Sequence, residues 1–423
     1  MARLRELIKD KNFSLLWFSQ IISNFGDRLN QMALIGLIYA RTPGSTIELA
    51  KLLSFTILPV FLIGPIAGIY VDRWNRKYTM ISCDLLRGLL VLLVPFILIS
   101  SRSMVPIYIV VFIIFSITRF FLPSKLSIIP DIVHKDKLLL ANSLTSTTMM
   151  IATIVGYGFG GIIVAGIGAK GGFYIDSVTY FVSALMVSFV ALRLKDKSEG
   201  SPYREKLSRL FLKKTIIGDI KEGLLYLKEH RDIRMVANTM FLIMAGVGSV
   251  YITIIVFIQE TLGSSTGHLG ILAMFLGAGL LLGSLMYGRF GSGLSKKKVI
   301  NFGLATTGLV IMIFSLSLKL YPYFFIAAGL SIILGVFASP IVISSNTLLH
   351  EVMADKMRGR IFSSLEIIMH LGFLIFMLLT SIIAERVNKE WILVIIGLVF
   401  LLIGLAKMVR GIIEKKGLFS FLF

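Results

Sequence analysis

Twelve apolar runs, each long enough to cross a bilayer as a helix, follow one another along the chain. A hydrocarbon core about 30 Å thick needs roughly 20 apolar residues of helix. The sequence therefore predicts an all-α integral membrane protein with 12 transmembrane helices. The expected spans are residues 13–40, 46–70, 79–100, 104–124, 139–168, 171–192, 235–259, 267–290, 298–318, 322–345, 361–384 and 391–410.

Composition supports this class and excludes others. Hydrophobic residues make up 56% of the chain and charged residues only 16%, against about 25% charged in a soluble domain. The single cysteine, Cys83, excludes a disulfide framework and a metal site built on several thiolates. Asp27 and Arg28 interrupt the first apolar run, so we expect that run to stay as a helix and not to be a cleaved signal peptide.

The basic residues indicate the orientation in the membrane. With the N-terminus inside, 33 of the 43 Lys and Arg residues fall in cytoplasmic segments and seven fall outside. Basic residues in short loops are retained in the cytoplasm. We therefore expect both termini to be cytoplasmic, in the plasma (inner) membrane. The net charge of +20 reflects this topology, and we expect no nucleic-acid partner.

The chain divides into six spans and six spans. Only the connection 193–234 is long, which predicts an N-terminal half over 1–192, a cytoplasmic central loop over 193–234 and a C-terminal half over 235–423. Within this loop, Lys214–His230 has the apolar spacing of an amphipathic helix at the inner interface. We interpret it as a tether between the halves, with a regulatory or partner-binding role as the alternative.

The two halves also repeat in sequence. A shift of 220 residues superposes Gly26 on Gly246, Gly68 on Gly288, Arg76 and Lys77 on Lys296 and Lys297, and Asp131 on Glu351. Six spans return the chain to its starting side, so the copies share one orientation. Such pseudo-symmetric halves hold a substrate cavity near the midplane and transport by rocking. The repeat indicates a transporter.

The loop after the second span carries a specific motif, Gly68-Ile-Tyr-Val-Asp72-Arg73-Trp74-Asn75-Arg76-Lys77. It resembles the loop signature of the major facilitator superfamily. A carboxylate here can accept hydrogen bonds from a helix N-terminus, arginines can bridge carboxylates, and the glycine lets a helix approach closely. We expect a cytoplasmic gate formed by Gly68, Asp72, Arg73, Arg76 and Lys77. The second-half copy has Ser292 in place of the acid.

The fifth span contains Gly156-Tyr157-Gly158-Phe159-Gly160-Gly161. This resembles the Gly-Pro-x-x-Gly-Gly motif of antiporters in that superfamily, with Tyr157 in place of the proline. Close helix packing alone is the alternative explanation of Gly156, Gly160 and Gly161. Together with Met357-Arg358-Gly359-Arg360 and several first-half segments, the resemblance is closest to the branch containing macrolide-efflux and enterobactin-exporter proteins.

Ionisable residues inside the bilayer are costly, so each indicates a partner or a function. Asp27 lies about 14 residues into the first span, roughly 21 Å from its inner start. Asp84 and Arg87 are spaced to pair with each other on the third span. Arg119 matches the arginine that the resemblance assigns to proton-linked exporters, with Asp84 or Asp27 as its partner. We expect Asp27, Arg119, Asp84 and Arg87 to couple transport to protons.

Four further residues are candidates for the substrate cavity: Asn24 and Gln31 on the first span, and Glu366 and His370 on the eleventh. Glu366 and His370 are spaced to share one helix face. Glu366 lies near the inner end of its span, so extension of its side chain to water is an equal alternative. Asp176 reads as a helix-end or interface residue without an assigned role.

The sequence predicts a secondary transporter, most simply a proton-coupled antiporter that exports small amphipathic compounds such as drugs or macrolides by alternating access. The alternatives are a dedicated siderophore or lysophospholipid carrier, or an importer of the same fold. No phosphate-binding loop, His-Glu-x-x-His or Gly-x-Ser-x-Gly motif occurs, so we expect no enzyme. We expect no cofactor or metal beyond the proton gradient, with sodium as an alternative ion, and a monomer whose partners are its cargo and the lipid bilayer.

Overall fold

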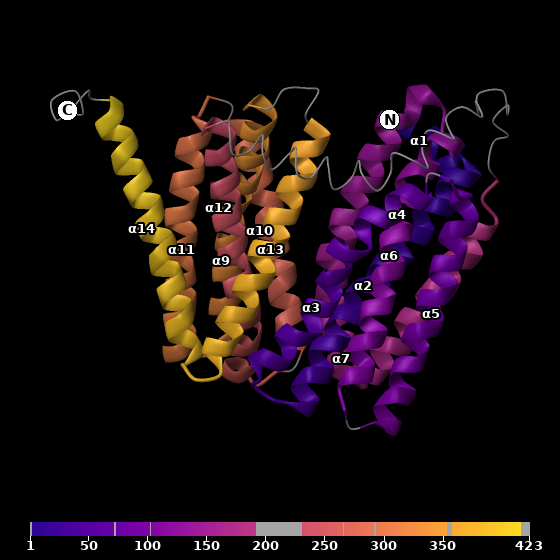
Figure 1. Ribbon diagram of the computed structural model, residues 1–423, viewed down its shortest axis with the longest axis horizontal. Helices are drawn as coiled ribbons and strands as arrows, with labels where there is room; N and C mark the ends of the chain where they lie inside the picture. Colours follow the sequence, from indigo (N-terminus) through magenta and orange to yellow (C-terminus); the bar gives the residue numbers. More distant parts are fainter. Residues whose placement is uncertain are drawn as a thin grey trace. The chain divides into compact units, whose positions relative to one another are not determined.

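The computed structural model describes residues 2–71, 73–101, 103–191, 231–264, 266–291, 293–352 and 358–415, and these are helices joined by short connections (Figure 1). The amphipathic helix predicted over 214–230, Asp72, Ser292 and Met357 lie outside the described residues. The elements are α1 (Ala2–Lys9), α2 (Lys11–Arg41), α3 (Thr46–Leu62), α4 (Gly64–Val71), α5 (Arg76–Ser100), α6 (Val105–Ile132), the 3-10 helix η1 (Lys135–Lys137), α7 (Leu138–Ser188), α9 (Arg231–Leu262), α10 (Gly267–Phe290), α11 (Lys296–Leu320), α12 (Phe324–Val352), α13 (Arg358–Ala384) and α14 (Lys389–Lys415).

These helices form two compact units. The first unit comprises Met1–Arg41 and Lys51–Gly218, and the second comprises Thr42–Ala50 and Asp219–Phe423. In the first unit α7 packs on α2 and α5, and α5 also packs on α6. In the second unit α9 packs on α13 and α14, α10 on α12, and α11 on both α12 and α14.

The helices of the two units repeat at the spacing that the sequence predicts. Helix α5 and helix α11 both have 25 residues and start 220 residues apart. An ion pair recurs at the same offset: Arg76 pairs with Asp131 in the first unit, and Lys296 Nζ lies 2.6 Å from Glu351 Oε1 in the second. Each pair ties the start of one helix to the end of the next.

Two predicted spans are interrupted where the backbone chemistry requires it. The span predicted over 46–70 is two helices, α3 and α4, that meet at Ile63. Pro65 follows this break and has no N–H to donate, which interrupts the helical hydrogen bonds. Helix α7 has 51 residues and turns at Gly168, where φ is 76°. Its two parts correspond to the predicted fifth and sixth spans.

Nine of the described helices are long and apolar enough to cross a membrane by length and composition. They do not include α2, which carries charges in its middle, or the shorter α3, and α7 is counted once. The count of twelve spans therefore stays a prediction, whereas the all-helical membrane class is confirmed. One boundary was wrong: helix α6 continues to Ile132 and includes Lys125, which the sequence placed in a loop.

Glycines bring α2 close to both parts of α7. A Cβ on Gly160 would lie 3.2 Å from the Cα of Leu29, and one on Gly156 would lie 3.0 Å from the Cβ of Arg28. On the other part of α7, Thr179 lies against the backbone of Gly26. Such contacts are possible only where no side chain intervenes. The polar residues in the middle of α2 are thus held between two helical segments.

Candidate functional site

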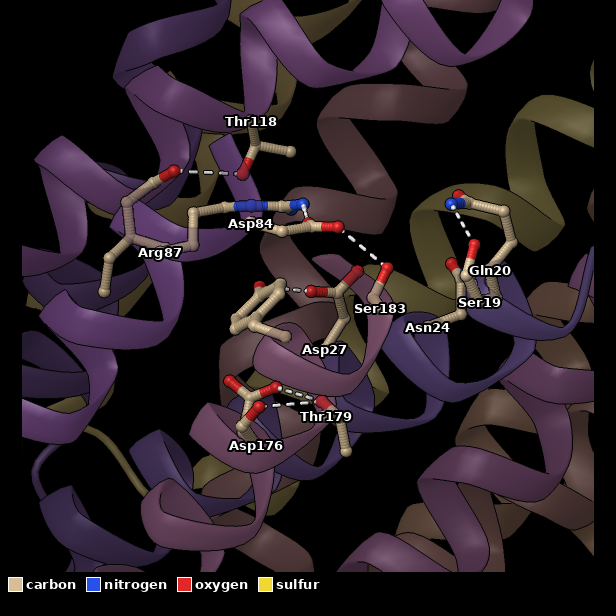
Figure 2. A network of polar contacts seen from close by, with 12 residues as sticks. Ser19, Gln20, Asn24, Asp27, Asp84, Arg87, Thr118, Asp176, Thr179 and Ser183 are labelled. Atoms are coloured by element: carbon tan, nitrogen blue, oxygen red, sulfur yellow. Dashed lines mark hydrogen bonds and ion pairs between the residues drawn. The ribbon is translucent and has the colours of Figure 1, made fainter. Parts of the chain in front are cut away.

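A buried ion pair lies at the centre of the first unit. The Arg87 guanidinium donates to the Asp84 carboxylate, and the two side chains are 1% and 0% exposed (Figure 2). The guanidinium carbon also lies 4.2 Å from the ring centre of Phe121 on α6 and 4.4 Å from that of Tyr180 on α7. Aromatic faces stabilise a desolvated cation. Ser183 Oγ donates to Asp84 Oδ2 at 2.7 Å, so α5, α6 and α7 all contribute to this pair.

Asp27 connects to this pair through Tyr180. The Tyr180 hydroxyl donates to Asp27 Oδ1, while the ring of the same tyrosine stacks on Arg87. Asp27 lies near the middle of α2 and is partly buried. Its hydrogen-bond partner among the described residues is therefore Tyr180, not Arg119 as the resemblance implied. Arg119 lies partly buried on α6.

Asp176 is part of the same region, which corrects its interpretation as a helix-end or interface residue. It lies after the turn of α7 at Gly168 and is 0% exposed. Asn30 Nδ2 on α2 donates to its Oδ2. Thr179 Oγ1 lies 3.3 Å from its Oδ1. Figure 2 draws Asp27 between the Asp84–Arg87 pair and Asp176.

Lys125 adds a buried positive charge. Its side chain is only 7% exposed on α6, because that helix continues beyond the predicted boundary. It interacts electrostatically with Asp27, Asp84 and Arg87. A buried ammonium is costly without compensating negative charge. The two carboxylates of this region supply that compensation.

A second polar cluster joins α2 to the first part of α7. Arg28 Nη1 donates to Gln31 Oε1 at 2.9 Å and lies 3.0 Å from Tyr157 Oη. The Tyr157 hydroxyl donates to the same Gln31 oxygen. The residue that replaces the motif's proline thus provides a hydroxyl to the first span. Nearby, Asn24 is buried and contacts Met149 on α7 and the carbonyl of Gln20.

The residues predicted for the cytoplasmic gate are only partly brought together. Arg76 pairs with Asp131 and donates to the Ser127 carbonyl at 2.9 Å. Arg73 is exposed and Lys77 partly buried. Gly68 has no atom within 4 Å of the position that a Cβ would take. The close helix approach expected at this glycine is therefore absent from the described part of the chain.

The two second-half candidates are neighbours on α13. Glu366 is exposed and His370 partly buried. His370 Nδ1 lies 2.8 Å from the backbone oxygen of Glu366, one turn earlier. The contact therefore uses the backbone of Glu366 and leaves its carboxylate at the exposed surface. Nothing in this arrangement resembles the buried acids of the first unit.

The sequence reasoning identified the acids and missed the neutral residues that connect them. Asp176, Tyr180 and Ser183 recur at intervals of four and three residues on α7 and so share one helix face. This polar stripe in an apolar span is the signal that could have found them. Carboxyls joined by a hydroxyl, beside a fixed guanidinium, can bind and exchange protons.

An all-helical membrane bundle with an internal six-span repeat defines a transporter of the major facilitator superfamily, as the sequence motif predicted. The chain belongs to the transmembrane secretion effector family within it, whose model matches residues 6–416. Macrolide efflux protein A of Streptococcus pyogenes is 24% identical over 90% of this chain and 91% of that protein. The putative bacilysin exporter BacE of Bacillus subtilis is 26% identical over 92% of this chain and 93% of that protein.

A solved structure shows the same fold. A bacterial homologue of the iron transporter ferroportin superposes with a TM-score of 0.70 at 12% identity, over 93% of this chain and 98% of that one. At this identity the likeness concerns the fold alone. The chain is accordingly a multi-pass membrane transporter, and its relatives include exporters.

Proposed function

We propose that this protein exports small amphipathic compounds, such as drugs or macrolides, in exchange for protons. It does so by alternating access in the plasma membrane, with both termini in the cytoplasm and without an enzymatic step or a bound cofactor. The contact that carries the proposal is the Tyr180 hydroxyl, which joins Asp27 to the ring face that holds Arg87. The similarity to macrolide and bacilysin exporters supports the direction of transport.

The coupling follows from the charge on Asp27. As an anion it accepts the Tyr180 hydrogen bond and balances the cations Arg87 and Lys125. When Asp27 takes up a proton, that balance is lost and the hydroxyl no longer faces a full negative charge. The bonds between α2 and α7 then favour a different arrangement. A proton on Asp27 thereby shifts the equilibrium between two conformations.

The test uses inside-out vesicles from cells expressing the full chain, acidified inside. Uptake of lipophilic dyes and macrolides is followed with and without a protonophore. We expect uptake to collapse with the protonophore and to fall by about 100-fold in Asp27→Asn, the order of magnitude of losing one proton-transfer group. Asp136→Asn makes the same chemical change at an exposed position on η1 and should leave uptake unchanged.

Two outcomes would overturn the proposal. Uptake that survives the protonophore but stops when a sodium gradient is removed would assign the coupling to sodium. Uptake with wild-type pH dependence in Asp27→Asn would remove this acid from the coupling. If no dye or macrolide is transported, the same vesicles tested with lysophospholipids, siderophores and small peptides would assign a dedicated cargo.

A further inference from the structure

We propose that Asp176 is a second proton-binding residue, which carries a proton within the membrane while Asp27 is ionised. Its part in transport rests on the proposed function, whereas the bound proton itself depends on no cargo. The inference starts from the partners of the Asp176 carboxyl. They are one amide, from Asn30, and one hydroxyl, from Thr179, and both are neutral.

The hydroxyl contact indicates where the proton is. Thr179 Oγ1 lies 2.7 Å from the backbone oxygen of Asp176 and 3.3 Å from its Oδ1. A hydroxyl has one hydrogen to donate. When that hydrogen goes to the nearer backbone oxygen, the contact with Oδ1 is a hydrogen bond only if the carboxyl carries a proton and donates it. The Asn30 amide then donates to the other carboxyl oxygen, so every group is satisfied.

The surrounding charges favour the same state. Asp176 is fully buried and forms no ion pair among the described residues. The charged groups that act on it are Asp27 on α2, which opposes its negative charge, and Arg87 on α5. Arg87, however, is bonded directly to Asp84, and Lys125 of α6 acts on the other acids. An ionised carboxylate without a cation is costly inside a membrane.

The two acids are also joined along one helical seam. Asp27 bonds to Tyr180, and Asn30 bonds to Asp176, one turn further along α2 and one turn back along α7. A Cβ on Gly26 would touch both Thr179 Oγ1 and Asp176 Oδ1, so this glycine leaves the room that the carboxyl occupies. A change of charge at either acid is therefore felt at the other.

Infrared spectroscopy of the purified full-length protein in lipid nanodiscs tests the proposal directly. We expect the carbonyl stretching band of a protonated carboxyl at neutral pH, and its loss in Asp176→Asn. Asparagine has the shape of a protonated aspartate and can donate to Thr179 and accept from Asn30, so the fold should be kept. Asp136→Asn, at the exposed control position, should keep the band. A band that persists unchanged in Asp176→Asn would overturn the proposal, as would no such band in the wild-type protein.

A transport measurement then separates this proposal from the proposed function. If both acids exchange protons in each cycle, the steepness with which maximal cargo accumulation depends on the proton gradient should fall in Asp176→Asn while transport persists. Unchanged steepness would overturn the role of Asp176 in coupling. A band assigned to Asp176 in a wild-type protein whose cargo uptake ignores the protonophore would support the bound proton and overturn proton-coupled export.

Discussion

The two units of this protein share one helical plan and differ in what lies between the helices. At the offset of 220 residues, Asp27, Asp84, Arg87 and Tyr180 of the first unit correspond to Val247, Leu304, Thr307 and Phe400 of the second. Gly26 and Gly246 correspond as well, and each lies against the helix opposite. Gly26 faces Thr179 and Asp176, whereas Gly246 faces the ring of Phe400.

This difference shows that the fold does not need the charges. The second unit fills the equivalent positions with apolar side chains and keeps the same helix bounds. Burying an ion pair stabilises a protein little compared with apolar packing. The charged residues of the first unit are therefore explained better by function than by stability.

The largest expected effect comes from giving the first unit the residues of the second at the ion pair. Arg87→Thr alone should lower the free energy of unfolding by about 3–5 kcal/mol, because it leaves the buried Asp84 without its cation. The double variant Asp84→Leu with Arg87→Thr should regain most of that loss and still fail to transport. Chemical unfolding in detergent micelles measures both. A double variant no more stable than Arg87→Thr would contradict the comparison.

The corresponding glycines should respond differently to a methyl group. Gly26→Ala and Gly246→Ala should each lower the free energy of unfolding by about 1–3 kcal/mol through overpacking. Only the second loss should be relieved by Phe400→Leu, because the atom that the new methyl would touch is the far end of that ring. At Gly26 the neighbours are a hydroxyl and a carboxyl. Rescue of Gly26→Ala by Phe400→Leu would show that the two seams are not independent.

The ion pairs that recur in both units should contribute little. Lys296→Gln should change the free energy of unfolding by about 0–1 kcal/mol, because its partner Glu351 is 52% exposed. Arg76→Gln should have the larger effect, since Asp131 is only 14% exposed and Arg76 also bonds a carbonyl. The measurement is the unfolding midpoint of each variant, and the reverse order would contradict this ranking.

The smallest effect concerns an acid of the second unit outside the spans. Burial raises the pKa of Glu385, but hydrogen bonds from the Ile47 amide and the Ser45 and Thr46 hydroxyls outweigh it, so the pKa is below the ordinary 4.5. This contribution to stability is therefore complete above about pH 4.5 and is lost as the pH falls through the lowered pKa. Thermal unfolding against pH should show a shallower acid decline in Glu385→Gln.

The sequence by itself determined the helical membrane class, the six-span repeat, the family and the acids inside the spans. These follow from apolar run length, from residues that recur at one offset, and from the cost of charge in a bilayer. Each is a property of residue type and spacing along the chain.

Only the tertiary structure decided which groups meet. Tyr180 joins Asp27 to Arg87, Asn30 reaches Asp176, and Lys125 is buried rather than placed in a loop. The rotation of each helix about its axis and the turn at Gly168 set these contacts. A list of spans contains neither, because partners on different helices depend on packing across the bundle and not on distance along the sequence.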